Sequence, residues 1–278
     1  MIEQTALAGI RRIASRANPR VKTWASLKDK QNRDTLGLTL AEGVHLVEEG
    51  LRPPEQDEVR LFGPVAFLVS DSGAARPEAG GFLAAARGLG IELFNLADDC
   101  YEKMSGLRNS EGVALVMSVA TKDDDIAAVT SKTGGKWLIA TGVQDPGNAG
   151  ALARTALAAG MDGCLFLDGA DPRSPKFLRG SMGAAFRLPC LSVSTETFIS
   201  AWPAGAVRLF AATTSATATD YRTAKYTTPF AILIGGERGI PDALSGMADE
   251  EIHIPLKGNV ESLNLAVAAG ILLFEALK

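Results

Sequence analysis

The polar residues best suited to chemistry lie in three short segments of the second half of the chain, residues 145–156, 234–241 and 254–264. Each segment follows or completes an apolar run that is typical of a buried strand. Open α/β sheets bind their ligands beyond the carboxyl ends of the strands. These segments are therefore candidate parts of one site, positioned by the strands that precede them.

The first segment places a single arginine on an otherwise apolar helix. Arg154 is the only charged residue between positions 148 and 160, and Asn148 is a candidate N-cap of the same helix. A packed helix cannot leave a guanidinium without a partner. Arg154 therefore either forms a buried salt bridge or points to a phosphate or a reacting oxygen at the strand ends. The residues alone leave both interpretations open.

The second segment is a glycine-rich turn that carries one carboxylate and one guanidinium, those of Glu237 and Arg238. Gly235, Gly236 and Gly239 are three glycines within five positions. Glycine lets the backbone approach a flat ligand closely, which favours a binding role. The alternative is a tight turn whose two charged side chains are only solvated.

The third segment runs from a strand through a loop into a long apolar helix, residues 262–278. Ser262 is the expected N-cap of that helix, which would be a purely structural role. Asn264 is a polar amide at the start of a nearly all-apolar helix. Because buried or half-buried amides are almost always hydrogen-bonded, we expect Asn264 to have a specific partner.

Strands and helices alternate along most of the chain. This pattern predicts an α/β fold with a mostly parallel sheet, because continuous apolar strands fit burial on both faces. Residues 1–35 have a helical pattern with a basic face. In the second half, the predicted helices are 148–160, 175–184 and 262–278, and the predicted strands are 137–143, 164–169, 207–214, 230–236 and 251–256.

Residues 120–136 mix acidic, hydroxyl-bearing and glycine residues between apolar segments, which is typical of a linker. We therefore predict a smaller α/β domain over residues 1–120 and a second domain over residues 121–278.

Charge is distributed unevenly between the two ends of the chain. The whole chain has a net charge of −4, whereas residues 1–33 have a net charge of +6. A basic arm on an acidic body indicates an anionic partner, whereas charge alone slightly favours the other interpretation, a solvated helix face. The residues of this arm that could bind an anionic partner, RNA if the resemblance described below holds, are Arg11, Arg12, Arg16, Arg20, Lys22, Lys28 and Arg33.

Several common classes of protein are disfavoured by composition. The three cysteines are far apart and there are two histidines, so we expect neither a disulfide framework nor a metal site. The apolar runs are too short to span a bilayer, and we expect a soluble cytoplasmic protein. The sequence also has no phosphate-binding P-loop, no GxGxxG fingerprint and no GxSxG nucleophile elbow.

In this order, the three segments resemble the motifs of the SpoU/TrmH family of RNA ribose methyltransferases, which belong to the SPOUT superfamily. The matching residues are Asn148, Gly150, Arg154 and Gly160, then residues 181–184, then residues 235–239, then residues 254–256 with 261–264. Together they span most of residues 137–278. Residues 18–49 are similar, more loosely, to the small substrate-binding domain of the same family.

This resemblance implies a catalytic domain with a deep C-terminal trefoil knot, which is an exception to the rule that chains do not thread loops. It also implies S-adenosylmethionine as the cofactor, bound by the loops of the second and third motifs. A homodimer would take Asn148 and Arg154 into the neighbouring subunit's site. The implied product is a ribose 2′-O-methyl group on large-subunit ribosomal RNA, or on transfer RNA as the alternative.

The resemblance also implies a role for each matching residue. Arg154 would bind phosphate and help to deprotonate the 2′-hydroxyl. A free guanidinium has a pKa above ~12 and is a poor base, so clamping the phosphate and stabilising the developing alkoxide is the other interpretation. Asn148 would orient Arg154 or the substrate, and Glu237 would hold the arginine or a ribose.

The remaining roles belong to the third motif and to the backbone. Ser262 and Asn264 would position the 2′-hydroxyl and its phosphate. Arg238 stands where a small residue is frequent in relatives. This departure makes the identity of the RNA substrate harder to infer from the resemblance. Two other classes are alternatives, a non-catalytic RNA-binding or ribosome-assembly protein and a small-molecule α/β enzyme. The expected cofactor-binding residues are Gly235, Gly236, Ile254, Leu256 and Leu263.

Overall fold

The computed structural model describes residues 9–55, 59–120, 135–215, 217–258 and 260–278. They form two compact units. The first contains the described residues before 121 together with Arg173–Phe186, and the second contains the described residues up to Pro172 and then Arg187–Lys278. The predicted linker, residues 120–136, lies almost entirely outside the described residues.

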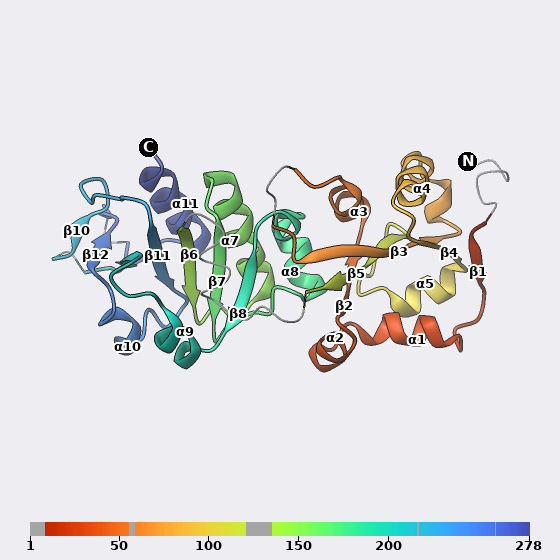
Figure 1. The fold of residues 1–278 in the computed structure, drawn as a ribbon, viewed down its shortest axis with the longest axis horizontal. Coiled ribbons are helices and arrows are strands. Elements are labelled where there is room, and N and C mark those ends of the chain that lie inside the picture. Colours follow the sequence, from red (N-terminus) through yellow and green to blue (C-terminus); the bar gives the residue numbers. More distant parts are fainter. Residues whose placement is uncertain (1–8, 56–58, 121–134, 216, 259) are drawn as a thin grey trace. The chain divides into compact units, whose positions relative to one another are not determined.

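The first unit is built on a five-stranded mixed sheet with the order β1-β4-β3-β5-β2 (Figure 1). Strand β5 is antiparallel to both of its neighbours, and the other pairs are parallel. The strands are β1 (Arg11–Ile13), β2 (Leu38–Glu42), β3 (Phe62–Ser70), β4 (Glu92–Leu96) and β5 (Val113–Val119). The helices are α1 (Pro19–Ser26), α2 (Lys30–Leu36), α3 (Val44–Leu51), α4 (Ala79–Gly88), α5 (Asp98–Met104) and α8 (Pro175–Ser181), with 3₁₀ turns η2 (Gly73–Ala75) and η3 (Ala184–Phe186).

Residues 1–8 of the predicted helical region, residues 1–35, lie outside the described residues. The described part contains α1 and most of α2, but the prediction is wrong at Arg11–Ile13. Arg11–Ile13 forms β1 and pairs in parallel with β4. This pairing is long-range in the sequence, and local periodicity cannot reveal it. The core beneath these elements contains Trp24 of α1 and Phe94 of β4, whose rings meet edge to face with centroids 5.1 Å apart.

The second unit is built on a seven-stranded sheet in which every pair of neighbouring strands is parallel, with the order β10-β12-β9-β11-β6-β7-β8. This confirms the predicted parallel α/β architecture. All residues of β7 and all but the last of β11 are buried, as expected for strands covered on both faces. The strands are β6 (Lys136–Thr141), β7 (Gly163–Leu167), β8 (Cys190–Val193), β9 (Arg208–Ala212), β10 (Thr219–Asp220), β11 (Phe230–Gly235) and β12 (Glu250–His253).

Two helices of the second unit pack against each other beside the sheet, α7 (Pro146–Ala159) and α11 (Leu265–Ala276) (Figure 1). Helix α7 ends at Gly160, whose φ of 83° provides the left-handed C-cap that the sequence indicates. Two shorter helices, α9 (Thr195–Ala201) and α10 (Asp242–Ser245), complete the unit.

The segment Arg173–Phe186 belongs to the first unit although the chain on both sides of it belongs to the second. Its contacts explain this placement. The Thr39 hydroxyl donates to the Arg173 carbonyl at 2.6 Å, His45 Nε2 lies 3.0 Å from the Met182 carbonyl, and the rings of Phe62 and Phe186 meet edge to face. The chain therefore passes between the units at both ends of this segment.

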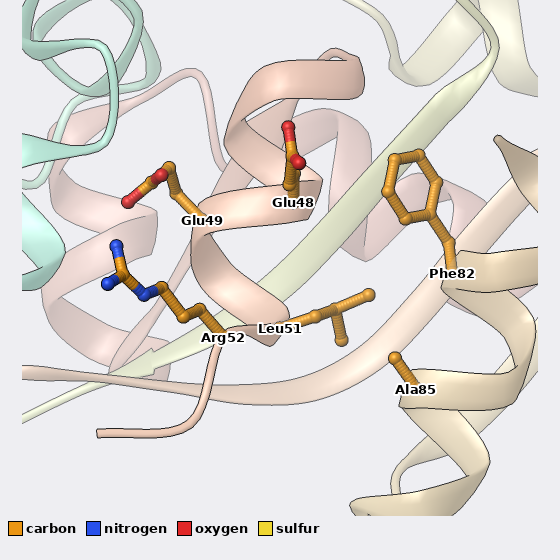
Figure 2. Close-up of a pocket in the computed structure, with 6 residues that line it drawn as sticks. All are labelled: Glu48, Glu49, Leu51, Arg52, Phe82 and Ala85. Carbon is orange, nitrogen blue, oxygen red and sulfur yellow. The ribbon is translucent and has the colours of Figure 1, made fainter. Parts of the chain in front are cut away.

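A cavity of about 430 Å³ lies between α3 and α4 in the first unit. Figure 2 shows Glu48, Glu49 and Leu51 of α3 around it, with Phe82 and Ala85 of α4 and Arg52, which follows α3. Its lining combines carboxylates with apolar surface, and none of these six residues is one of the predicted site residues.

Candidate active site

The three sequence segments meet at one edge of the parallel sheet. Strands β6, β11, β9 and β12 are successive neighbours, and all run in the same direction. Their carboxyl ends therefore lie at the same edge. Residues 142–148 follow β6, residues 236–240 follow β11 and residues 254–264 follow β12. The sheet thus gathers segments that are more than 100 positions apart in the chain.

The glycines at the end of β11 are required by close backbone packing. A Cβ on Gly235 would lie 2.3 Å from the carbonyl carbon of Gly239. A Cβ on Gly236 would lie 2.7 Å from the carbonyl oxygen of Gly142, in the loop that follows β6. The second contact joins the turn after β11 to the loop after β6, which leads into the first motif, so the glycine pattern serves the assembly of this edge as well as any ligand.

Glu237 and Arg238 form the tip of a tight turn. The Gly239 amide donates to the Gly236 carbonyl at 2.9 Å, and Gly239 has a φ of 74°. Both charged side chains are exposed, and neither forms a hydrogen bond or an ion pair with any described residue. Within one chain the turn thus places one carboxylate and one guanidinium at the site edge, available to a ligand or a second chain.

Helix α7 begins at Pro146, two residues before the predicted start at position 148, because Asp145 is its N-cap. The Asp145 carboxylate accepts from the Asn148 amide at 3.0 Å, and Pro146 occupies the first helical position. The assignment of Asn148 as the cap is therefore wrong. Its side chain is exposed in the first turn of the helix, beside the site edge.

Arg154 is exposed, and it forms no hydrogen bond or ion pair with the described part of the chain. The buried salt bridge, one of the two interpretations left open by the sequence, is absent from the described residues. Arg154 lies on the face of α7 that also presents Gly147, Ala151 and Ala158, because these positions recur at helical spacing. The helix face that packs against α11 is a different one, where Thr155 Cγ2 would lie 3.6 Å from a Cβ on Gly270.

Asn264, and not Ser262, is the N-cap of α11. Its side-chain oxygen accepts from the amides of Ala266 at 3.0 Å and Val267 at 3.4 Å. This is the specific partner that the sequence required, supplied by the helix itself. Ser262 is exposed in the preceding loop, two residues too early to cap a helix that begins at Leu265.

The loop between β12 and α11 offers both apolar surface and backbone polar groups. Ile254 and Leu263 are half-buried, and Leu256 is 37% exposed. Among the described residues, the amides of Leu256 and Lys257 donate to no protein acceptor. Such a loop can contact an aromatic ring with its side chains and hydrogen-bond it with its backbone.

The structure adds residues at this edge that we did not predict from the sequence. Strand β9 lies between β11 and β12, so Thr213 and Ser215 follow its carboxyl end between the second and third motifs. The Thr213 hydroxyl accepts from the Ser215 amide at 3.2 Å. The run of threonine and serine directly after an apolar strand was the available signal.

Three arginines of the basic arm are paired with carboxylates in the first unit. Arg11 and Arg20 contact Glu92 at 2.5 and 2.8 Å, and Arg12 forms a two-pronged contact with Asp71. The hydrogen bond from Arg20 lowers the pKa of Glu92, and that from Arg12 lowers the pKa of Asp71. These pairs are exposed, so each adds little stability, but they neutralise part of the arm.

The other cations of the arm have different environments. Arg16, Lys22 and Lys28 are exposed, and none forms an ion pair with a described residue. Arg33 is only 5% exposed, and its guanidinium donates to the carbonyls of Leu27 and Lys28 at 3.0 and 2.9 Å. Its inclusion among the RNA-binding residues is therefore corrected, because it holds the turn between α1 and α2.

The described residues contain no group of three or more histidine, cysteine or acidic side chains that could hold a metal ion. The described helices include none that is long and apolar enough to cross a bilayer. Cys100, Cys164 and Cys190 are all buried, and burial raises the pKa of the Cys164 thiol.

Comparison with known families gives two matches that together cover most of the chain. Residues 136–274 match the SpoU rRNA Methylase family, and residues 18–115 match the MRM3-like substrate binding domain. The first match contains all three polar segments of the candidate site. The second lies within the first structural unit.

Individual relatives align over nearly the whole length. The 23S rRNA (guanosine(2553)-2′-O)-methyltransferase RlmP of Bacillus subtilis is 30% identical, covering 95% of this chain and 98% of the relative. The 23S rRNA (uridine(2479)-2′-O)-methyltransferase of Streptomyces viridochromogenes is 29% identical, covering 96% and 92%. The crystal structure of the AdoMet-bound rRNA methyltransferase of Sinorhizobium meliloti has a TM-score of 0.79 at 28% identity, covering 97% and 98%.

These matches agree with the architecture, with the order of the motifs and with their convergence at one sheet edge. The fold is that of the SPOUT methyltransferases, the trefoil-knot class, preceded by an N-terminal domain. The chain belongs to the SpoU rRNA methylase family.

Proposed function

We propose that this protein transfers a methyl group from S-adenosylmethionine to a ribose 2′-hydroxyl of large-subunit ribosomal RNA. The observation that carries the proposal is the convergence of the loops after β6, β11 and β12 at one sheet edge, in a chain of the SpoU family. The two aligned curated relatives named above are both 23S rRNA 2′-O-methyltransferases. Ribosomal RNA as the substrate implies action in the cytoplasm.

The residues at the sheet edge fit the cofactor. The packing of Gly235 and Gly236 leaves no room for side chains, so the turn is a backbone surface. Ile254, Leu256 and Leu263 supply apolar contact for the adenine ring. The amides of Leu256 and Lys257, which have no acceptor among the described residues, can hydrogen-bond its edge. When bound, S-adenosylmethionine supplies the sulfonium methyl group that is displaced.

The polar side chains have roles that suit an attack by a ribose hydroxyl. Arg154 binds the phosphate next to the target ribose and stabilises the alkoxide that forms as the 2′-hydroxyl loses its proton. Its guanidinium is too basic to accept that proton readily. Glu237 holds Arg154 or the ribose, Asn148 orients them, and Ser262 with the free amide group of Asn264 positions the hydroxyl.

We infer that the active enzyme is a homodimer in which Arg154 and Asn148 act in the partner's site. Helix α7 runs away from the site edge, so Arg154 lies about 12 Å along the axis from its start, at about 1.5 Å per residue. On α11, Val267 and Phe274 are 51% and 55% exposed and lie two turns apart on the same face. A second copy that covered this face would bury both side chains and give Arg154 a partner.

We also propose a division of labour between the two halves of the chain. Residues 1–120 bind the RNA, and residues 121–278 bind the cofactor and catalyse the transfer. A non-catalytic RNA-binding role is the competing interpretation, and turnover distinguishes the two.

The test is transfer of tritium from labelled S-adenosylmethionine to unmodified ribosomal RNA, with Arg154→Ala as the control. We expect label in the large-subunit RNA with the wild-type protein and loss of nearly all label with the variant. Labelling of transfer RNA alone would show that transfer RNA, and not ribosomal RNA, is the substrate. The absence of label despite cofactor binding would favour the non-catalytic interpretation.

A further inference from the structure

Four cations of the first unit gather at one end of its sheet. The Lys103 ammonium donates to the Arg16 carbonyl at 2.8 Å, and the Lys28 ammonium donates to the Ser105 carbonyl at 2.7 Å. These bonds bring together the loop after β1, the turn between α1 and α2, and the loop after α5; α1 and α5 lie side by side in Figure 1. Arg108 lies in the same loop as Ser105. We name Arg16, Lys28, Lys103 and Arg108 the basic edge cluster.

A buried carboxylate, that of Glu42, accepts hydrogen bonds from the loop that carries Arg108. Glu42, at the end of β2, is only 3% exposed. It accepts from the Ser105 hydroxyl, from the Gly106 amide at 3.2 Å and from the Ser110 hydroxyl at 3.1 Å. All three donors come from residues 105–110. Because a buried carboxylate must keep its donors, the loop has a fixed path, and Arg108 and Asn109 are exposed on it.

The charges of the basic edge cluster are not neutralised within the described residues. Lys28 and Lys103 donate to backbone carbonyls, and the side chains of Arg16 and Arg108 form no ion pair. Of the nearest acidic neighbours in sequence, Asp29 caps α2, Glu111 pairs with Arg76, and Glu102 is exposed. By contrast, Arg11, Arg12 and Arg20 each have a carboxylate partner.

This difference determines which cations an RNA phosphate can bind with the smallest loss of existing interactions. A phosphate that approaches Arg11, Arg12 or Arg20 must displace Asp71 or Glu92, and exchanging one anion for another gains little. A phosphate that approaches Lys28 or Lys103 competes only with a neutral carbonyl. Arg108 additionally offers a planar guanidinium that can bind phosphate through two hydrogen bonds.

We propose that the basic edge cluster is the surface through which the first unit binds the phosphates of the substrate RNA. This inference rests on the proposed function and assigns its RNA-binding role to four residues, two of which lie outside the basic arm. Phosphate contacts of this kind orient the RNA without reading its sequence. The cluster is therefore a docking surface that brings an RNA to the enzyme, separate from the residues that act on the ribose.

The test is equilibrium binding of an unmodified large-subunit ribosomal RNA transcript over a series of salt concentrations. We compare the wild type with Lys28→Gln, Lys103→Gln, Arg108→Gln and the triple variant. Each lost phosphate contact should reduce the slope of log K against log salt by about one, and the triple variant by about three. Arg108 is exposed and Arg108→Gln breaks no hydrogen bond or ion pair among the described residues, so it reports on binding even if the lysine variants are less stable.

The matched control is Arg52→Gln. Arg52 is exposed and pairs with Glu55. It follows the last residue of α3, whereas Glu42 precedes the first residue of that helix, so the length of α3 separates the two positions. The Arg52→Gln variant removes one positive charge, as each cluster variant does, and should leave the slope of log K against log salt unchanged. In turnover, the triple variant should raise KM for RNA by about tenfold or more and leave kcat nearly unchanged.

Three outcomes would overturn the inference. An unchanged slope in the triple variant, while the wild type binds and methylates RNA, would refute the cluster and leave the proposed function intact. An equal loss of slope in Arg52→Gln would show that the charge acts without a defined surface. A wild-type protein that binds no RNA at any salt concentration would contradict both the cluster and the proposed function.

Discussion

Gly236 lies so close to the loop after β6 that a Cβ at its position would come 2.7 Å from the carbonyl oxygen of Gly142. This contact joins the second motif to a loop residue more than 90 positions away in the chain, three positions before the first motif begins. The glycine is therefore part of what assembles the site edge, and its substitution tests whether that assembly binds the cofactor.

We predict that Gly236→Ala weakens binding of S-adenosylmethionine at least about tenfold and lowers the free energy of unfolding by about 1–3 kcal/mol, because the backbone must move to admit the methyl group. Calorimetric titration and denaturant unfolding measure the two effects. Gly88→Ala, in α4 of the first unit, is the control, because its added Cβ would meet nothing within 4 Å. Unimpaired cofactor binding in Gly236→Ala would separate this turn from the cofactor site.

Asn264 permits a separation of its structural and catalytic roles. Asn264→Ala removes the cap of α11 and should cost about 1 kcal/mol of stability. Asn264→Asp keeps a capping oxygen for the amides of Ala266 and Val267 and should retain that stability. If the amide group also positions the ribose, Asn264→Asp will lose activity although it folds normally. Equal activity of Asn264→Asp and wild type would reduce Asn264 to a helix cap.

Arg154 should matter for turnover and not for the stability of the monomer. Its side chain is exposed and forms no hydrogen bond or ion pair with the described residues, so Arg154→Ala should change the free energy of unfolding of the monomer by no more than about 0.5 kcal/mol. Methyl transfer by the same variant should fall by about a hundredfold or more. Arg154→Lys should recover little of it if the guanidinium binds phosphate through two hydrogen bonds. Retention of most of the turnover in Arg154→Lys would refute that geometry.

The exposed apolar face of α11 tests the dimer. Phe274→Asp should weaken self-association by about 2 kcal/mol or more, because it places a charge where a partner would bury an aromatic ring. Sedimentation velocity over a concentration series measures the change, and loss of activity should accompany it. Ile199→Asp, on α9 of the same unit and 40% exposed, should leave the association unchanged. A Phe274→Asp protein that remains dimeric would remove α11 from the interface.

Glu42 should be among the most sensitive acidic residues of the first unit. Glu42→Ala leaves the Gly106 amide and the hydroxyls of Ser105 and Ser110 without their acceptor. Each of these groups that stays buried should lower the free energy of unfolding by about 1–3 kcal/mol. Thermal unfolding of the variant measures the loss. Glu48→Ala, exposed on α3, should change stability by no more than about 0.5 kcal/mol. Similar unfolding temperatures for the two variants would contradict the structural role of Glu42.

The sequence predicted the parallel architecture of the second half and the sheet edge at which the site forms. Buried parallel strands are continuous apolar runs, so they are visible without knowledge of their partners. Once those strands are parallel, the polar segments that follow them must gather at one edge. The convergence of Asn148, Glu237 and Asn264 toward that edge followed from this rule alone.

The sequence did not predict which polar residue caps each helix. Asp145 and Asn148, and likewise Ser262 and Asn264, are all good capping residues within three positions of each other. The choice depends on where the backbone leaves its extended conformation, which tertiary packing decides. Pro146, at the first position of α7, was the local signal in favour of Asp145.

Long-range contacts account for the other differences. The strand Arg11–Ile13 exists because β4 pairs with it, and the pairing of Arg11 and Arg20 with Glu92 neutralises charges that the sequence counts as free. The burial of Arg33 has the same origin. Removing residues 1–33, a simple test of a basic arm, would also delete Val21, Trp24 and Leu27 from the core. Single charge substitutions are therefore the appropriate test.

The most direct test of the central claim is the chemical identity of the methylated nucleoside. Unmodified large-subunit ribosomal RNA is incubated with the wild-type enzyme and S-adenosylmethionine, digested to nucleosides and analysed by mass spectrometry. We predict one new nucleoside whose extra methyl mass is on the ribose fragment, and its absence with Arg154→Ala. A methyl group on the base fragment, or equal product with Arg154→Ala, would contradict it.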